Sequence, residues 1–160
     1  MIGNDVIDLN LAKTESNWQR KGFLNKIFTK NEQILIQNSK NKELTVWNLW
    51  SRKEAAYKIW NRETGIRKLN PTQFECFDLD LEIGKVQIES KTYYTKTIIN
   101  SDYIHSVAVT ILSDFNKIRT IENEIVIDKH LRLTFQIIEK GIVIPISKSH
   151  HGRFEFTLSL

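Results

Sequence analysis

The hydrophobic period of this chain changes at Asn70–Pro71, and this change limits the possible folds more than any other feature of the sequence. Before this point, aromatic residues recur at three- and seven-residue intervals, which is the spacing of one face of a helix. After it, apolar residues alternate with polar ones or form short β-branched runs, as they do in strands. The sequence therefore predicts an α+β fold, with a long helix packed on an antiparallel sheet.

The clearest helical signal begins at Leu44 and ends at Gly65, a residue type that commonly stops helices. The aromatic residues that carry the helical spacing are Trp47, Trp50, Tyr57 and Trp60. This region is expected to form the long helix of the fold.

A second helix is predicted at about residues 30–38, because Thr29 and Glu32 have the spacing of a capping box. Residues 16–28 also have a helical pattern, which Gly22 weakens. Two shorter helices are thus expected before the long one.

Strands are predicted at both ends of the chain and throughout its second half. Residues 1–9 read as an opening strand, and the segments 141–147 and 153–160 as closing strands. Between them, an antiparallel meander is expected with turns at Gly84–Lys85, Ser90–Lys91 and Asn100–Ser101–Asp102. Residues 114–140 are compatible with a strand and a short helix.

The composition is that of a globular protein, with 41% apolar and 26% charged residues. A length of 160 residues fits one domain, so we expect a single domain over residues 1–160. No apolar run is long enough to cross a membrane, and residues 1–10 do not have the pattern of a secretory signal. A lone cysteine, Cys76, cannot form an internal disulfide, which favours a cytoplasmic location.

The formal net charge of +4 and the sequence pI of about 9.1 favour anionic partners. The basic residues are spread along the chain and do not gather in a tail or stripe. A nucleic-acid-binding module would depend on the pI and the aromatic residues alone, so nucleic acid and membranes are not expected partners.

Glu54 lies on the apolar stripe of the predicted long helix, and two explanations for it are open. The stripe contains Trp47, Trp50, Glu54, Tyr57 and Asn61. A carboxylate in such a position must be paired, hydrogen-bonded or bound to a cation, because an isolated buried charge is costly. Lys58, four residues later, would also form an ordinary helix pair with Glu54.

Two further segments contain polar residues in patterns that are weak individually. Near the start, Gly3 and Asp5 form a G-x-D pattern, and Asp8 follows three residues later. Near the end, the segment "SKSHHGRF" groups Ser149, His150, His151 and Arg153 around a glycine. A terminal aspartate is usually solvated or a cap, and the histidine pair has no zinc-ligand spacing to other residues.

Taken together and in this order, three segments resemble motifs of the 4′-phosphopantetheinyl transferase superfamily, especially its short, single-domain holo-acyl-carrier-protein synthase type. "GNDVIDL" (residues 3–9) resembles the family's G-x-D motif. "WSRKEAAYK" (residues 50–58) matches its W-x-x-K-E-A-x-x-K helix. "SKSHHG" (residues 147–152) resembles its S-x-S-H segment.

The resemblance implies transfer of the 4′-phosphopantetheine group of coenzyme A to a serine of an apo acyl or peptidyl carrier protein, releasing adenosine 3′,5′-bisphosphate. It implies Asp5 and Glu54 as ligands of Mg²⁺, which suits chemistry on a diphosphate. Lys58 would contact the diphosphate or help to remove the serine proton. The catalytic residues expected from the resemblance are thus Asp5, Glu54 and Lys58.

The resemblance also implies a set of residues that bind coenzyme A. His150 matches the family's histidine at the coenzyme A nucleotide, and Ser149 would support it. Lys58 is expected at the phosphates, and Lys53 and Arg52 could also bind phosphate, although on a helix they point away from the Glu54 stripe. Arg153 is included among the residues expected to bind coenzyme A. Asp8 aligns with an acidic position beside the metal, outside the ligand set.

The order of the motifs is that of the short members, whose sites lie between neighbouring subunits. It therefore implies a homo-oligomer, with a trimer favoured. An alternative function remains open, because residues 141–160 depart from the family pattern. The chain would then be a non-catalytic relative that binds coenzyme A or a carrier protein.

Overall fold

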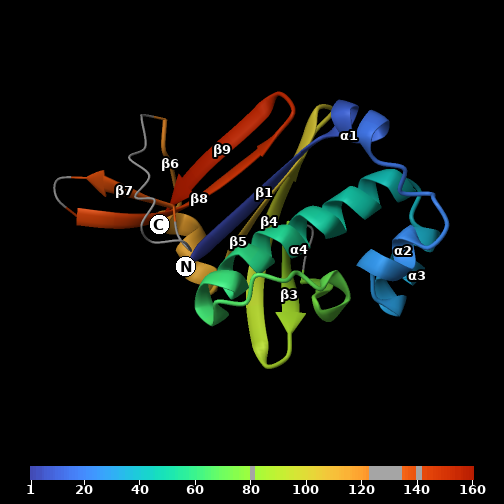
Figure 1. The fold of residues 1–160 in the computed structure, drawn as a ribbon, viewed down its shortest axis with the longest axis horizontal. Helices are drawn as coiled ribbons and strands as arrows, with labels where there is room; N and C mark the ends of the chain where they lie inside the picture. Colours follow the sequence, from blue (N-terminus) through green and yellow to red (C-terminus); the bar gives the residue numbers. More distant parts are fainter. Residues whose placement is uncertain (80–81, 123–134, 140–141) are drawn as a thin grey trace.

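The computed structural model describes residues 1–79, 82–122, 135–139 and 142–160, which form two antiparallel sheets and one long helix with shorter helices beside it (Figure 1). The strands of the larger sheet, in the order β1-β5-β4-β3-β2, are β1 (Ile2–Asp8), β2 (Glu75–Asp78), β3 (Ile83–Ile88), β4 (Lys91–Ile99) and β5 (Tyr103–Val109). Those of the second sheet, in the order β6-β9-β8-β7, are β6 (Arg119–Thr120), β7 (Phe135–Glu139), β8 (Ile142–His151) and β9 (Phe154–Ser159). The predicted α+β class is confirmed.

The helices precede the meander in the chain. They are α1 (Leu9–Glu15), α2 (Phe23–Ile27), α3 (Lys30–Asn38) and α4 (Lys42–Thr64), and short 3-10 helices follow at Pro71–Gln73 and Leu112–Lys117. The predicted capping box of α3 is present, with Thr29 and Glu32 bonded to each other's backbone. Helix α4 starts at Asn41, whose side chain accepts from the Leu44 N–H, and stops at Gly65 with φ +73°. The helices predicted at about residues 30–38 and from Leu44 to Gly65 are both present.

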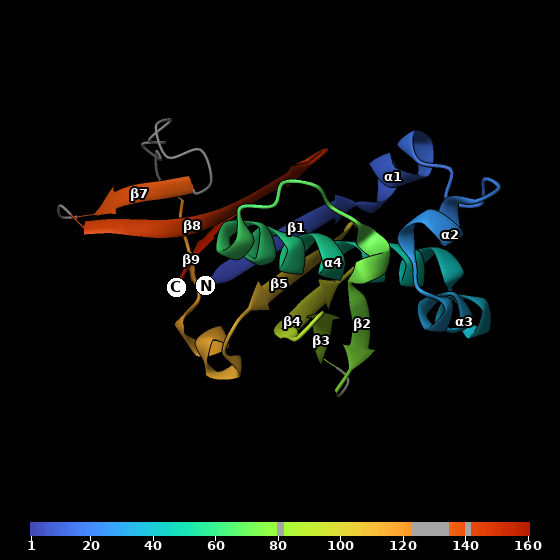
Figure 2. The ribbon, with the colours of Figure 1, turned by 60° about the horizontal axis from the view of Figure 1, so that its bottom comes forward.

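Helix α4 lies across one face of the larger sheet, and its buried apolar side chains pack with those of the strands in one hydrophobic core (Figure 2). Side chains of β1 alternate between two faces, and Gly3 lies on the face covered by α4. A Cβ atom at Gly3 would collide with the Ala55 carbonyl oxygen of α4. Glycine is therefore needed for the close approach of helix and strand, and Asp5, two residues later, faces the same helix.

Strand β1 is an edge strand of its sheet, and side chains satisfy part of its outer backbone (Figure 1). The β8–β9 hairpin lies along this edge. The N–H of Asn4 donates to Ser147 Oγ at 2.8 Å, and the N–H of Asp8 donates to His151 Nδ1 at 2.8 Å. The edge is thus covered without a continuous backbone ladder, which blocks further strand pairing.

Cations of α4 satisfy outer carbonyls of β1. Arg62 Nη1 donates to the Ile2 carbonyl at 2.7 Å, and Lys58 Nζ donates to the Asn4 carbonyl at 2.6 Å. Helix α4, strand β1 and the β8–β9 hairpin are therefore joined along one line. Both chain ends lie close together at the end of this line (Figures 1 and 2).

Two sequence predictions are wrong in detail. The turn expected at Gly84–Lys85 lies within β3, which begins at Ile83, whereas β2 ends at Asp78. Gly84 is small for a different reason, because a Cβ there would collide with the guanidinium of Arg52. The helix expected over 16–28 is present only at Phe23–Ile27.

Helix α1 was not predicted, although its N-terminal signal is in the sequence. Asp8 Oδ1 accepts from the N–H groups of Asn10 and Leu11, so Asp8 is the N-cap of α1. The prediction for residues 114–140 falls partly on 123–134 and 140, which lie outside the described residues. No helix among the described residues has the length and apolarity needed to cross a membrane.

Candidate active site

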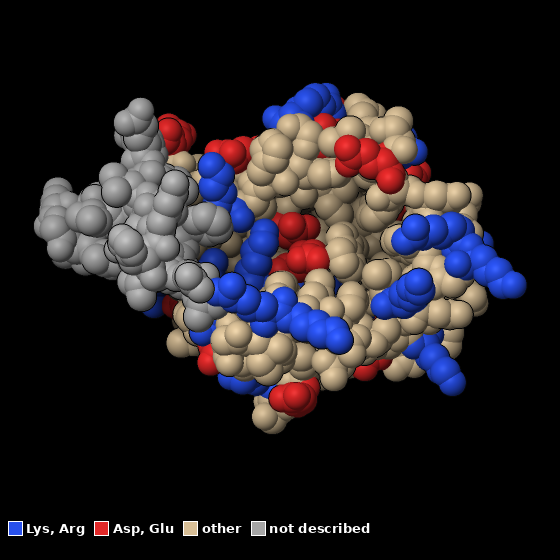
Figure 3. Space-filling model, in the orientation of Figure 1, with Lys and Arg blue, Asp and Glu red and all other residues tan. Residues whose placement is uncertain are grey.

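Asp5 of β1 and Glu54 of α4 line one cavity of about 190 Å³. Trp47 and Trp50 of α4 contribute aromatic surface to it, and His150 and His151 of β8 also line it. In Figure 3, acidic side chains lie at the bottom of a hollow near the middle of the face, with Lys and Arg side chains along its border. The two carboxylates predicted as metal ligands are therefore brought together by the fold.

The carboxylate of Asp5 is largely buried, with 17% of its side chain exposed. Burial raises its pKa to about 6, and the ammonium of Lys58, 3.6 Å from Oδ1, offsets part of this effect. Asp5 is thus a carboxylate whose negative charge is only partly balanced.

The negative charge of the Glu54 carboxylate is even less balanced by neighbouring cations. Burial and the neighbouring charge of Asp5 raise its pKa to about 7, and Lys58 only partly counteracts them. Within the described part of the chain, its carboxylate makes no hydrogen bond or ion pair. The ammonium of Lys58 instead pairs with Asp5 and the Asn4 carbonyl, so the plain Glu54–Lys58 helix pair is not formed.

The residues present fit a divalent cation that is held jointly by protein and substrate. Mg²⁺ is usually bound by one or two carboxylates together with phosphate oxygens and water. The described residues contain no group of three or more His, Cys, Asp and Glu that would form a complete protein cage. Two adjacent carboxylates, one of them unpaired, are the donor set expected for such a shared ion.

Lys58 connects three elements beside this pair. In addition to Asp5 and the Asn4 carbonyl, its Nζ donates to the Lys148 carbonyl of β8 at 3.4 Å. Its side chain remains 27% exposed. Lys58 is therefore fixed next to the carboxylates while keeping access to solvent.

Lys53 lies away from this cavity, and the phosphate-binding role expected for it does not fit its position. Its side chain is fully buried, and Nζ lies 2.6 Å from Glu32 Oε2. It also donates to the carbonyls of Ile27 and Pro71 at 2.9 and 2.8 Å. The side of α4 that carries Lys53 is covered by the segments around α3 and Pro71–Gln73, which a helical wheel does not reveal.

The β8 hairpin strand presents alternate residues to β1. Ser147 and His151 accept from β1 backbone N–H groups, and Ser149 Oγ accepts from Asn4 Nδ2 at 2.9 Å. His150 lies between them in the alternation and is exposed. His151 is therefore the histidine fixed against β1, a residue that the sequence analysis did not include among the site residues.

Arg153 and Asp8 form a clamp at the turn of the hairpin. Arg153 Nε and Nη2 donate to the two Asp8 oxygens at 2.9 and 3.1 Å. Hydrogen bonds from Arg153 hold the pKa of the Asp8 carboxyl far below its usual range. The guanidinium is thus engaged by Asp8, which serves as a cap and clamp, and the coenzyme A-binding role expected for Arg153 stays a prediction.

A buried polar cluster behind Asp5 was also missed. Asn4 Nδ2 lies 3.2 Å from His105 Nε2, and the His105 ring stacks on Phe156 with centroids 4.1 Å apart. Burial lowers the pKa of His105 to about 4, so the ring is neutral. The cluster links β1, β5 and β9 and fixes the residue next to Asp5.

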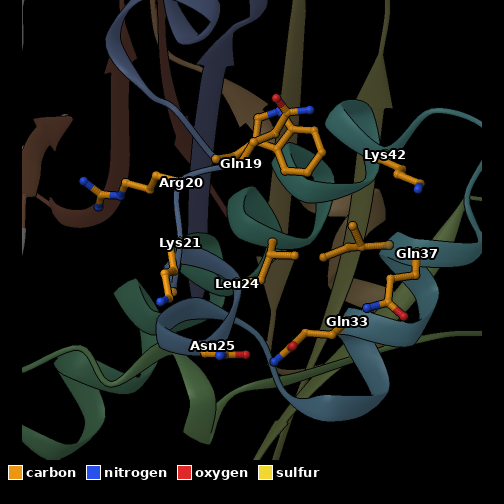
Figure 4. A pocket seen from close by; sticks show the side chains of 11 residues that line it. Gln19, Arg20, Lys21, Leu24, Asn25, Gln33, Gln37 and Lys42 are labelled. Atoms are coloured by element: carbon orange, nitrogen blue, oxygen red, sulfur yellow. The ribbon is translucent and has the colours of Figure 1, made fainter.

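A larger cavity, of about 490 Å³, lies elsewhere (Figure 4). Gln33 and Gln37 of α3 lie on one side of it, and Arg20 and Lys21 of the loop before α2 lie on the other. Lys42 at the start of α4 adds a third cation, and the described residues that line the cavity include no carboxylate. This region is a basic and amide-rich surface.

A family model agrees with the site geometry. The model of the 4′-phosphopantetheinyl transferase superfamily matches residues 1–112 of the chain. The chain belongs to the 4′-phosphopantetheinyl transferase superfamily. The match includes Asp5, Glu54 and Lys58, and the resemblance seen in the sequence is confirmed. No match was found among curated proteins.

Solved structures of superfamily members have the same fold. The chain is similar to Helicobacter pylori holo-[acyl-carrier-protein] synthase in complex with coenzyme A, with 16% identity and a TM-score of 0.55 over 69% of this chain and 100% of that chain. The chain is also similar to the Bacillus anthracis synthase in complex with CoA (3′,5′-ADP), with 18% identity and a TM-score of 0.51. This match covers 67% of this chain and 91% of that chain. The Thermotoga maritima synthase is 13% identical to the chain, with a TM-score of 0.51, and the match covers 99% of this chain and 82% of that chain.

The superfamily match ends before the hairpin. Residues 113–160 lie outside it, and these include the segment 147–152 that resembles the S-x-S-H motif. About two thirds of the chain is enough to cover the Helicobacter pylori chain completely. The match to the Thermotoga maritima synthase covers 99% of this chain and therefore extends over the β8–β9 hairpin.

Proposed function

We propose that this protein transfers the 4′-phosphopantetheine group of coenzyme A to a serine of an apo acyl or peptidyl carrier protein, in a Mg²⁺-dependent reaction. The serine oxygen forms a bond to the phosphorus that carries pantetheine. The bond from this phosphorus to the bridging oxygen breaks, and adenosine 3′,5′-bisphosphate leaves with the electron pair. The serine proton passes to a base at the site.

One observation carries the proposal: Glu54 is an unpaired carboxylate next to Asp5 in a cavity of a superfamily member. Asp5 and Glu54 would hold Mg²⁺, which when bound neutralises charge on the diphosphate and on the leaving oxygen. Lys58, fixed beside Asp5, adds a positive charge for the phosphates. His150 and His151 border the same cavity on the hairpin side.

The partners we propose are coenzyme A and an acidic carrier protein. A net charge of +4 favours both, and the cavity next to α2 and α3 has cationic side chains and no carboxylate. Ser16, which lines the Asp5–Glu54 cavity, precedes Trp18 of this basic region by two residues. A carrier protein bound there would lie near the carboxylates.

Several properties expected from the sequence or from the resemblance stay predictions. They are a single domain over residues 1–160, a cytoplasmic location and a homo-oligomer with a trimer favoured. Contacts of α4 with β1 and of β1 with β8 support the single domain. Gel filtration with light scattering tests the oligomer, and a fully active monomer would contradict it.

A second candidate function is a non-catalytic relative that binds coenzyme A or a carrier protein. It is favoured by the engagement of Lys53 and Arg153 in ion pairs within the protein. Such a relative would bind coenzyme A, which fluorescence of Trp47 and Trp50 can report, without modifying any carrier.

The test is mass spectrometry of apo carrier proteins after incubation with coenzyme A, Mg²⁺ and this protein. We expect the mass of one phosphopantetheine to be added by the wild type and by Glu43→Gln, a control on the same helix, and not by Glu54→Gln. Coenzyme A binding without added mass on any carrier, under conditions in which a known transferase works, would favour the second candidate.

A further inference from the structure

We propose that Arg62 binds a phosphate group of coenzyme A one helical turn beyond Lys58, and so extends the Asp5–Glu54 site along α4. The identity of this ligand rests on the proposed function, whereas the affinity of Arg62 for phosphate is a separate claim. The described residues that line the cavity do not include Arg62, which lies farther along the helix.

Arg62 lies on the same face of α4 as Glu54 and Lys58. The three residues follow one another at intervals of four, which places their side chains one above the next on a helix. Lys58 Nζ donates to the Asn4 carbonyl, and Arg62 Nη1 donates to the Ile2 carbonyl at 2.7 Å. Because these carbonyls belong to alternate residues of β1, the two cations lie one after the other along its edge.

The charge of Arg62 differs from that of earlier cations on the same helix. Arg52, Lys53 and Lys58 lie 2.7, 2.6 and 3.6 Å from a carboxylate oxygen. Within the described ranges, Arg62 has no ion pair, although its side chain is partly buried. Burial lowers the pKa of its guanidinium, and no described carboxylate lies close enough to oppose this effect. An anion that reached this cation would remove the cost of its incomplete solvation.

The guanidinium of Arg62 also has unused hydrogen-bond donors. An arginine carries five N–H donors in a planar fork. In the described part of the chain, only Nη1 of Arg62 donates a hydrogen bond. Two neighbouring donors of such a fork bind two oxygens of one phosphate at the same time, which an ammonium group does not do. Arg62 is therefore suited to hold a phosphate in a fixed orientation.

Coenzyme A carries phosphate at two places, a diphosphate and a 3′-phosphate on the ribose. One helical turn is about 5.4 Å, so Arg62 is displaced from Lys58 by about this rise. A ligand whose diphosphate lies beside the proposed ion can thus contact Lys58 and Arg62 with different phosphate oxygens. Lys and Arg side chains lie along the border of the acidic hollow in Figure 3, and their potential favours the approach of such an anion.

A purely structural role is the competing explanation for Arg62. A cation in the last turn of α4 interacts favourably with the helix dipole, and its hydrogen bond satisfies the Ile2 carbonyl. This role would make Arg62 matter for stability and would leave the affinity for phosphate unchanged. Measurements of affinity therefore separate the two roles.

Thermal unfolding with inorganic pyrophosphate in metal-free buffer tests phosphate binding without any assay of transfer. At about tenfold its dissociation constant, we expect pyrophosphate to raise the unfolding midpoint of the wild type by about 3 °C or more. The midpoint of Arg62→Met should rise by about a third as much, and Arg62→Lys, which keeps the charge, should recover part of the shift. Lys91→Met is the control, because it removes a cation near the same end of α4 that Glu63 already pairs.

Isothermal titration calorimetry with Mg²⁺ present then identifies the phosphate group. We expect Arg62→Met to bind coenzyme A at least about tenfold more weakly than the wild type, and Lys91→Met to bind it equally well. A loss with coenzyme A but not with 3′-dephospho-coenzyme A assigns the contact to the 3′-phosphate. An equal loss with both ligands assigns it to the diphosphate.

Equal pyrophosphate shifts in the wild type and Arg62→Met, or no shift in either protein, would overturn the inference. Equal affinities of these two proteins for coenzyme A would overturn it as well. A wild type that responds to pyrophosphate through Arg62 but does not bind coenzyme A would contradict the proposed function and retain the phosphate contact.

Discussion

Lys53 and Glu54 are consecutive residues of α4, yet the charge of Lys53 is fully paired within the protein and the charge of Glu54 is not. Lys53 is completely buried and has Glu32 and two carbonyls as partners. Glu54 is partly buried, faces Asp5, and has no hydrogen bond or ion pair within the described ranges. One turn of helix therefore contains a saturated charge and an unsatisfied one.

The saturated cluster is complete on its acidic side as well. Glu32 Oε1 accepts from the Cys76 N–H at 2.9 Å, and Oε2 accepts from the Thr29 N–H at 2.8 Å. These bonds join α3, α4 and β2. Buried ions with all their partners hold elements together, whereas a buried ion without partners costs stability and marks a site that awaits a ligand.

The largest effect on stability is expected from breaking the saturated cluster. Lys53→Met leaves the Glu32 carboxylate buried and unpaired, and should lower the free energy of unfolding by about 3–5 kcal/mol. Urea denaturation measures this, with Lys58→Met as the matched and milder control. A Lys53→Met protein as stable as the wild type would show that the two regions do not differ as described.

The next largest effect is expected at the unpaired carboxylate of Glu54. Glu54→Gln removes a proposed ligand of the ion and should lower the rate of phosphopantetheine transfer by about 10²-fold or more. The fold should be kept, since no hydrogen bond or ion pair of the described residues is lost. Glu43→Gln, assayed in parallel, should keep the wild-type rate. Equal transfer rates for the wild type and both variants would contradict a role of Glu54 in the reaction.

The pH dependence of stability gives a smaller effect of definite sign. Because the pKa of Glu54 rises from 4.5 to about 7 on folding, the folded state binds more protons than the unfolded state between these values. In metal-free buffer, stability should therefore fall by about 1–3 kcal/mol as the pH rises through this range. Denaturation at several pH values should show a shallower fall for Glu54→Gln; identical slopes would contradict the assignment.

The smallest effect is expected at an exposed ion pair of the hairpin. Lys148 Nζ lies 2.7 Å from Glu155 Oε1, with 32% and 51% of the two side chains exposed. Lys148→Ala should change the free energy of unfolding by less than about 1 kcal/mol. It keeps the carbonyl that Lys58 contacts, so thermal unfolding and transfer should both resemble the wild type; a larger loss would give this side chain a role in docking.

Much of this contrast could be predicted from the sequence, and part of it could not. The helical period from Leu44 to Gly65 placed Glu54 on the aromatic stripe and Lys53 off it. The wheel could not show that Lys53 meets Glu32, because that contact depends on how α3 packs across the chain. Only the three-dimensional structure separates a covered side of the helix from an exposed one.

The hairpin illustrates the same limit. The closing strands were predicted, but the first was expected to stop at residue 147 and instead continues to His151. Had the strand been extended, its alternation would have selected His151 over His150 as the residue facing β1. The clamp between Asp8 and Arg153 joins positions 145 residues apart, so no local pattern announces it.

The most direct test of the account is binding of Mn²⁺, a paramagnetic substitute for Mg²⁺ at carboxylate sites, measured by electron paramagnetic resonance with coenzyme A present. We expect the wild type and Lys148→Ala to bind the ion alike, and Glu54→Gln to bind it at least about tenfold more weakly. Equal Mn²⁺ affinity of Glu54→Gln and wild type would contradict the claim that the unpaired carboxylate beside Asp5 is a cation site.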